Sequence, residues 1–113
     1  MLIFNRKRND IEKTKAILDG FREREKTAIW SGAIVVSFDQ EPISSGGLPW
    51  RLINLLLKVT PPQGKHFVAK TTWKVQETSI ALLQPGNEIS VKIDASDPNV
   101  IYPNIQGAEY MPQ

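Results

Sequence analysis

The residues of this chain that could do chemistry are one histidine and a few carboxylates. His66 is the single histidine among 113 residues, and the chain has no cysteine. Zinc sites and nucleophilic triads need a histidine with convergent partners, whereas His66 falls alone on the polar side of an alternating stretch. The sequence has no HExxH motif, nucleophile elbow or EF-hand loop. We therefore predict a protein that is not an enzyme and that has no catalytic, cofactor-binding or metal site.

Two aspartates, Asp94 and Asp97, flank a predicted turn. Aspartate side chains commonly accept hydrogen bonds from nearby backbone amides and so cap such turns. The alternative is a weak calcium site, but this would need more oxygen ligands than the neighbouring sequence supplies. We interpret the pair as turn caps.

A group of cations with one tryptophan forms the candidate partner surface. Lys70 and Lys74 occupy the polar positions of one predicted strand, and the neighbouring strand adds further cations. OB-like modules hold single-stranded nucleic acid on such surfaces through phosphate contacts and stacking. Lysines on a strand also discourage edge-to-edge pairing without binding anything. The predicted surface consists of Trp50, Arg51, Lys58, Lys65, His66, Lys70 and Lys74.

A predicted β-hairpin over 51–75 positions these side chains. The stretch 65–75 alternates between inward and outward residues with the period of a half-buried strand, which places Phe67 and Trp73 in the core. Pro61-Pro62-Gln63-Gly64 separates it from the strand-like run at 50–60, and its glycine can adopt the positive φ that closes such a turn. The hairpin is therefore the predicted centre of a small β-domain.

Three further strands are predicted at 29–38, 88–94 and 99–102, and Gly32 indicates a bulge in the first of them. The segment 76–84 is predicted to be either a short helical turn or an irregular crossing. Its core-filling residues would be Ile80, Leu82 and Leu83. The loop at 39–49 is rich in glycine, proline and serine, and we interpret it as a connection rather than a phosphate cradle.

The N-terminal part is predicted to be helical from Asn9 to about Lys26. Asn9 would be the N-cap, and Glu12 would complete a capping-box-like pattern. Gly20 is a point at which we expect the helix to end or loosen. Residues 1–8 are interpreted as a frayed terminus, and weak contact with a membrane surface or an anionic partner is the alternative.

Composition predicts one ordinary globular domain, because 41% of the residues are apolar, 23% are charged and the net charge is +2. No apolar run is long enough to span a bilayer, and the absence of cysteine favours a cytoplasmic location.

We predict a basic tip and helix over 1–27, a β-domain over 28–102 and a flexible tail over 103–113. The predicted fold is mainly β: a five-stranded antiparallel barrel or rolled sheet, OB-like in one version, with one N-terminal α-helix.

The closing part of the β-domain carries the pattern PGxxIxVKxD at 85–94, followed by DPxxI at 97–101. Three shorter motifs precede it in the sequence: GAxV at 32–35, GxP at 47–49 and LxVxP at 57–61. Over 32–101 the chain resembles a widespread group of uncharacterised bacterial β-domains, many of which lie beside membrane segments or short oligomerisation (SHOCT-type) segments. Ala95 departs from the proline that such relatives often carry. The resemblance implies a small β-domain and no known catalysis.

The function predicted from these patterns is a non-catalytic binding or assembly module. The first hypothesis is a protein-interaction domain that self-associates or docks near a membrane, and its marker would be an exposed apolar patch along the helix or the first strand. The alternative is an OB-like binder of single-stranded nucleic acid, and its marker would be salt-dependent affinity that is lost when Lys70 and Lys74 are changed.

Overall fold

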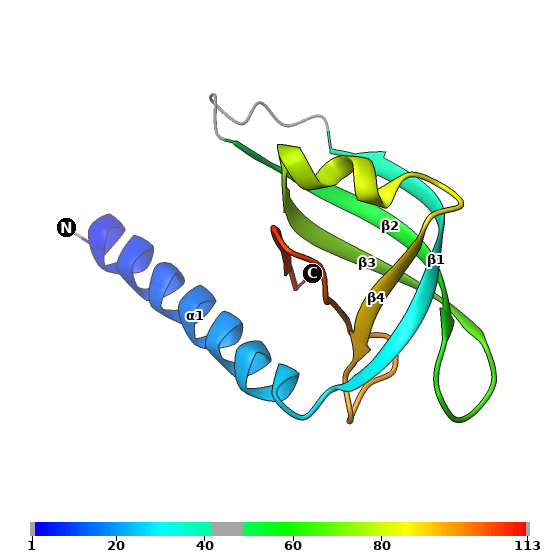
Figure 1. Cartoon of the computed structure of the whole chain (residues 1–113). Helices are drawn as coiled ribbons and strands as arrows, with labels where there is room; N and C mark the ends of the chain where they lie inside the picture. The colour runs from blue at the N-terminus through cyan, green and yellow to red at the C-terminus, as the bar shows by residue number, and fades with distance from the viewer. Residues whose placement is uncertain (1, 42–48, 113) are drawn as a thin grey trace.

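The computed structural model describes residues 2–41 and 49–112, with side chains described from Glu12 onward. One helix precedes six strands and a 3₁₀ helix (Figure 1). The elements are α1 (Leu2–Glu25), β1 (Ile29–Gln40), β2 (Trp50–Thr60), β3 (Phe67–Gln76), η1 (the 3₁₀ helix, Glu77–Leu83), β4 (Glu88–Ile93), β5 (Ile101–Pro103) and β6 (Ala108–Tyr110).

The strands form one antiparallel sheet in the order β5-β4-β1-β2-β3-β6, which curls into a nearly closed barrel (Figure 1). Its two end strands meet where the ring of Tyr102 in β5 lies edge-on to the ring of Tyr110 in β6, with centroids 5.3 Å apart. This confirms the predicted barrel-like β fold with one N-terminal helix. The sheet has six strands rather than the predicted five.

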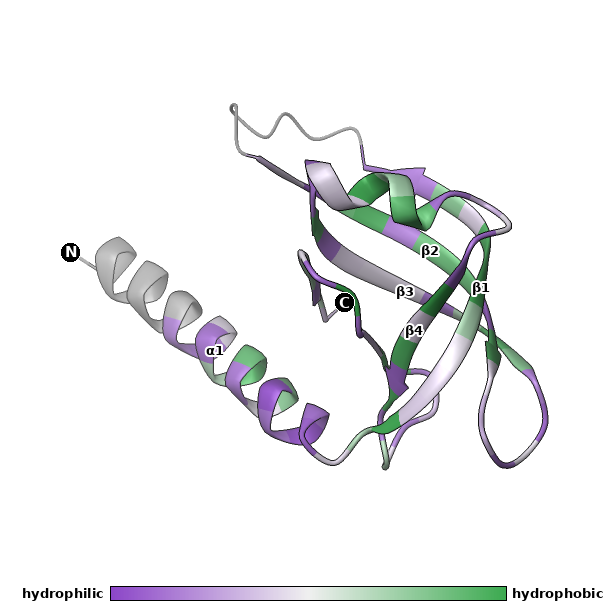
Figure 2. Ribbon diagram, viewed as in Figure 1, coloured by the Kyte–Doolittle hydropathy of each residue, from purple (hydrophilic) through white to green (hydrophobic). Residues whose placement is uncertain are grey.

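Inward side chains of the alternating strands fill the barrel, and the predicted hairpin over 51–75 is confirmed. Trp73 is fully buried, and its Nε1 donates a hydrogen bond of 3.0 Å to the carbonyl of Ile101. Thr71 Oγ1 donates to the same carbonyl at 3.2 Å, so β3 is fastened to β5 through the interior. Figure 2 shows hydrophobic residues concentrated in the barrel, while the described side chains of α1 are mostly hydrophilic.

The N-terminal helix is longer than predicted. It begins at Leu2 and continues through Gly20, so Asn9 lies inside the helix and is not its N-cap. Residues with good helix propensity surround that asparagine, and one interior glycine costs only about 1 kcal/mol, so neither residue interrupts the helix. The predicted capping box at Glu12 is therefore wrong.

Two details of the β-domain also differ from the prediction. Gly32 pairs regularly with strands on both sides, and the bulge lies between Val35 and Ser37 instead. In η1, Leu83 is fully buried and Ile80 packs against the core, but Leu82 is 49% exposed. Most of the predicted loop over 39–49 lies outside the described residues.

The predicted flexible tail contains the sixth strand, in which Ala108–Tyr110 pairs with the end of β3. Gly107 makes this possible because its φ of +83° turns the chain before β6. Its carbonyl accepts a hydrogen bond of 2.8 Å from the amide of Gln76. This turn joins β6 to the barrel, which is why the segment is not a loose tail.

Gly107→Ala is expected to lower the free energy of unfolding by about 2 kcal/mol, because the change adds backbone strain and displaces a hydrogen-bonded hydroxyl. A Cβ there would lie 2.5 Å from Oγ of Ser79, which donates to the carbonyl of Gln106. Gly64→Ala is the control, since its φ is +102° with nothing within 4 Å of a Cβ. Denaturant titration would contradict this account if both variants lost the same stability.

Candidate functional site

The strand register aligns four exposed residues side by side across the outer face of the barrel. Ile34 of β1 pairs with Glu88 of β4 on one side and with Lys58 of β2 on the other. Lys58 in turn pairs with Val68 of β3. We call Glu88, Ile34, Lys58 and Val68 the outer row; all four side chains are exposed.

Exposed apolar side chains lie in this row and next to it along β1. Exposed fractions are 66% for Trp30, 40% for Ile34, 48% for Val36 and 58% for Val68, and these four residues form what we call the outer-face patch. β1 lies near the middle of the sheet, whereas α1 packs beside β6. Only the last turn of the helix comes near Trp30, and the patch stays exposed (Figure 1). Residues 33–36 of β1 are all apolar, and the structure leaves Ile34 and Val36 among them exposed.

Cations stand among these apolar groups. Lys58 and Lys70 have no ion-pair partner within the described parts of the chain. Lys92 lies with its Nζ 5.8 Å from the centre of the Trp30 ring and 3.6 Å from a carboxylate oxygen of Glu25. The patch is therefore apolar with a mainly basic border.

Most of the predicted surface residues share this outer face. Lys58, Lys70 and Lys74 all lie on the outer side of the sheet by register. Lys74 and Trp50, however, line a pocket between α1 and the barrel, where the Nζ of Lys74 is 4.7 Å from the centre of the Trp50 ring. Lys65 and His66 are exposed in the turn that precedes β3.

Arg51 does not share the outer face, contrary to the prediction. Its register partner is the fully buried Val75, so it belongs to the opposite side of β2. There its guanidinium pairs with the carboxylate of Glu77. The prediction grouped Arg51 with Lys58 because both belong to the same strand. Side chains alternate between the two faces of a strand, and these residues are seven positions apart, so they point to opposite faces.

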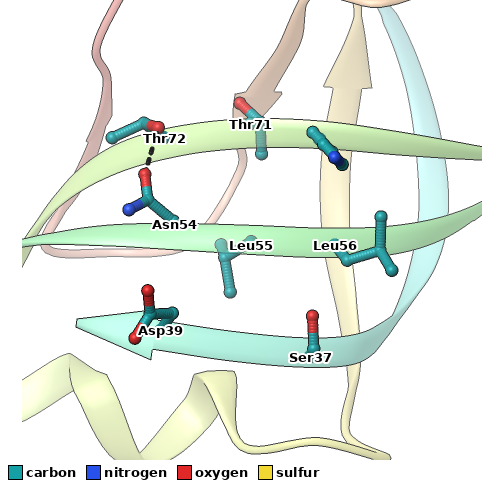
Figure 3. Close-up of a pocket in the computed structure, with 8 residues that line it drawn as sticks. Ser37, Asp39, Asn54, Leu55, Leu56, Thr71 and Thr72 are labelled. Carbon is teal, nitrogen blue, oxygen red and sulfur yellow. Dashed lines mark hydrogen bonds between the residues drawn. The ribbon is translucent and has the colours of Figure 1, made fainter. Parts of the chain in front are cut away.

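A shallow groove of about 320 Å³ continues the outer face between β1, β2 and β3 (Figure 3). Polar side chains dominate its middle, where Thr72 Oγ1 donates a hydrogen bond of 2.6 Å to Asn54 Oδ1. The Asn54 amide group donates to Glu41 at 3.4 Å. Ser37, Asp39, Leu56 and Lys70 complete most of the lining. The groove therefore extends the outer face with a mixed lining, in which Asn54 and Thr72 bond to each other.

The most strongly perturbed carboxylate of the described chain lies elsewhere, between α1 and the barrel. The side chain of Asp94 is only 1% exposed, and it receives Nε and Nη2 of Arg24 at 3.1 and 2.8 Å. The hydroxyl of Tyr102 and the amides of Ser96 and Asp97 also donate to it. Burial disfavours the charged carboxyl, but these donors together hold the pKa of Asp94 well below its usual range.

This cluster holds α1 against the barrel. Burial and the bond to Asp94 raise the pKa of the Tyr102 phenol, so both groups keep their ordinary protonation states near neutral pH. Phe21 of α1 adds a ring contact with Tyr110, with the ring centroids 5.1 Å apart.

The prediction of Asp94 and Asp97 as turn caps is confirmed. Asp94 accepts from the amides of Ser96 and Asp97, and Asp97 accepts from the Asn99 amide at 3.0 Å. The role of Arg24 was missed because its partner is 70 residues away and no local pattern marks it.

Among the described side chains, those of residues 12–41 and 49–112, no three histidine or acidic groups come close enough together to hold a metal ion. The described helices include none that is long and apolar enough to cross a membrane. Comparisons with models of known protein families, with curated proteins and with solved structures found no match. We therefore infer function from the outer face itself.

Proposed function

We propose that this protein is a non-catalytic assembly module, in which copies of the chain associate through the outer-face patch. The observation that carries the proposal is the exposure of Trp30, Ile34, Val36 and Val68 on one face of the sheet. Apolar side chains grouped on a surface mark interaction sites, and tryptophan is common among the residues that dominate binding energy. An exposed apolar patch along the first strand is also the marker expected for an interaction domain.

Binding of single-stranded nucleic acid fits the same face less well. Such binders need a continuous path of cations with aromatic rings free to stack. Trp30 is an exposed ring on this face, but the ring of Trp50 is covered by Lys74. Arg51 lies on the other side of β2, and the acidic Asp39 and Glu88 share the outer face with the cations. The apolar centre of the face favours a protein surface as its partner.

Light scattering coupled to size-exclusion chromatography tests this proposal on the full chain over a range from micromolar to millimolar. The mass is expected to rise from monomer towards dimer with concentration. Ile34→Lys should weaken the dimer at least about tenfold, because it puts a charge into the apolar centre of the contact. Ile34 is 40% exposed, so its substitution should leave the fold intact, which circular dichroism would verify.

Leu82→Lys is the matched control. Leu82 is an exposed leucine on η1, outside the outer-face patch, so this substitution should leave the dimer unchanged. A wild-type chain that remains monomeric at millimolar concentration would overturn the proposed self-association. Equal weakening by both substitutions would show that the patch is not the contact.

A further inference from the structure

The charges of the outer row are arranged so that the row is complementary to itself. Ile34 stands in the middle, with the carboxylate of Glu88 on one side and the ammonium of Lys58 on the other. Within the described chain neither group has an ion-pair partner. Both are exposed and therefore available to a second molecule.

We propose that two copies pack their outer faces together around a two-fold axis that runs along β1 through Ile34. Glu88 of each copy then meets Lys58 of the other, which gives two equivalent ion pairs. This inference rests on the proposed function and names the arrangement of the partner on the same site.

Charge decides between the two simple orientations of such a dimer. A rotation about an axis along β1 exchanges the two sides of the strand, so each carboxylate faces an ammonium. A rotation about an axis across the strands keeps the sides in place, so Glu88 would face Glu88 and Lys58 would face Lys58. Like charges placed opposite each other across an interface are unfavourable, whereas opposite charges fix the register.

The apolar groups fit the same axis. Trp30 and Ile34 both point outward from β1, so each would lie beside its own counterpart at the centre of the contact. Gly32 lies between them and presents no side chain, and a hollow of about 500 Å³ borders it and Trp30. The carboxylate of Glu88 lies at its edge, with Oε1 4.0 Å from the position of a Cβ on Gly32, so the indole of the second copy would lie beside this carboxylate. An apolar centre with charged groups at its border is the usual anatomy of a protein interface.

Charge reversal tests the arrangement, with the dimer dissociation constant measured by sedimentation equilibrium. Lys58→Glu and Glu88→Lys are each expected to raise this constant at least about tenfold, because each brings like charges together at two places. The double variant K58E/E88K restores the pairing with reversed signs. It should bind within about threefold of the wild type, since the contacts are otherwise unchanged.

Lys70→Glu is the matched control, because Lys70 is an exposed lysine of the same face that lies two strands away from β1. With the axis along β1 it meets no opposite charge, so its reversal should change the constant by less than about threefold. Failure of the double variant to recover would overturn the axis while leaving self-association in place. A wild-type monomer at every concentration would remove both proposals.

Discussion

Asp94→Asn is expected to lower the free energy of unfolding by about 3 kcal/mol, because a buried carboxylate that serves several donors is lost. Its side chain is 1% exposed, and the donors include the buried hydroxyl of Tyr102 and the amides of Ser96 and Asp97. The amide that replaces the carboxylate would turn an NH₂ group towards one set of these donors. Arg24 contributes less to the loss, since its side chain is 40% exposed and water can solvate it.

The same substitution should change how stability depends on pH. The hydrogen bonds from Arg24, Tyr102 and Ser96 hold the pKa of Asp94 in the folded protein well below the usual value for an aspartate. The unfolded chain therefore binds a proton first as the pH falls, and the stability that Asp94 supplies is complete above about pH 4 and is lost below it. Denaturant titrations between pH 7 and pH 2 should show a steeper acid loss for the wild type than for Asp94→Asn.

Asp97→Asn is the control for this prediction, because Asp97 caps the same turn through the Asn99 amide but receives no bond from the helix. It should cost about 0.5 kcal/mol and keep the acid dependence of the wild type. If Asp94→Asn kept the wild-type acid dependence as well, the low pKa that we assign to Asp94 would be contradicted.

Local pattern was sufficient to predict the parts of the fold that depend on neighbouring residues. The alternation over 65–75 and the glycine at 64 gave the hairpin, and the isoleucine-valine alternation after 88 gave β4. β6 was missed because three residues carry too little periodicity to stand out. Its position depends on the turn at Gly107 and on pairing with a distant strand.

The candidate surface was predicted in part for a similar reason. The period of two placed Lys58, Lys70 and Lys74 on the same side of the sheet, as the register confirms. Whether an apolar patch on the first strand would be exposed was left open, because the position of α1 is not a local property. The helix is fixed by Arg24 and Asp94, which lie 70 residues apart, and by its contact with the β5–β6 edge. Only the folded arrangement shows that Trp30 and Ile34 remain open.

Trp73→Ala should be the most destabilising single change considered, with a loss of about 4 kcal/mol in the free energy of unfolding. The indole is fully buried, so its removal leaves a large cavity in the barrel. It also removes one of the two donors that hold the Ile101 carbonyl of β5 to β3.

Trp73→Phe separates these two causes. Phenylalanine keeps most of the ring volume but cannot donate to the Ile101 carbonyl, which retains Thr71 as a donor at 3.2 Å. The expected loss is therefore only about 1–2 kcal/mol. If Trp73→Phe were as damaging as Trp73→Ala in denaturant titrations, the hydrogen bond across the barrel would outweigh the packing. The folded fraction of either variant should still dimerise with the wild-type constant, because Trp73 faces the core and the proposed contact uses the opposite face of the sheet.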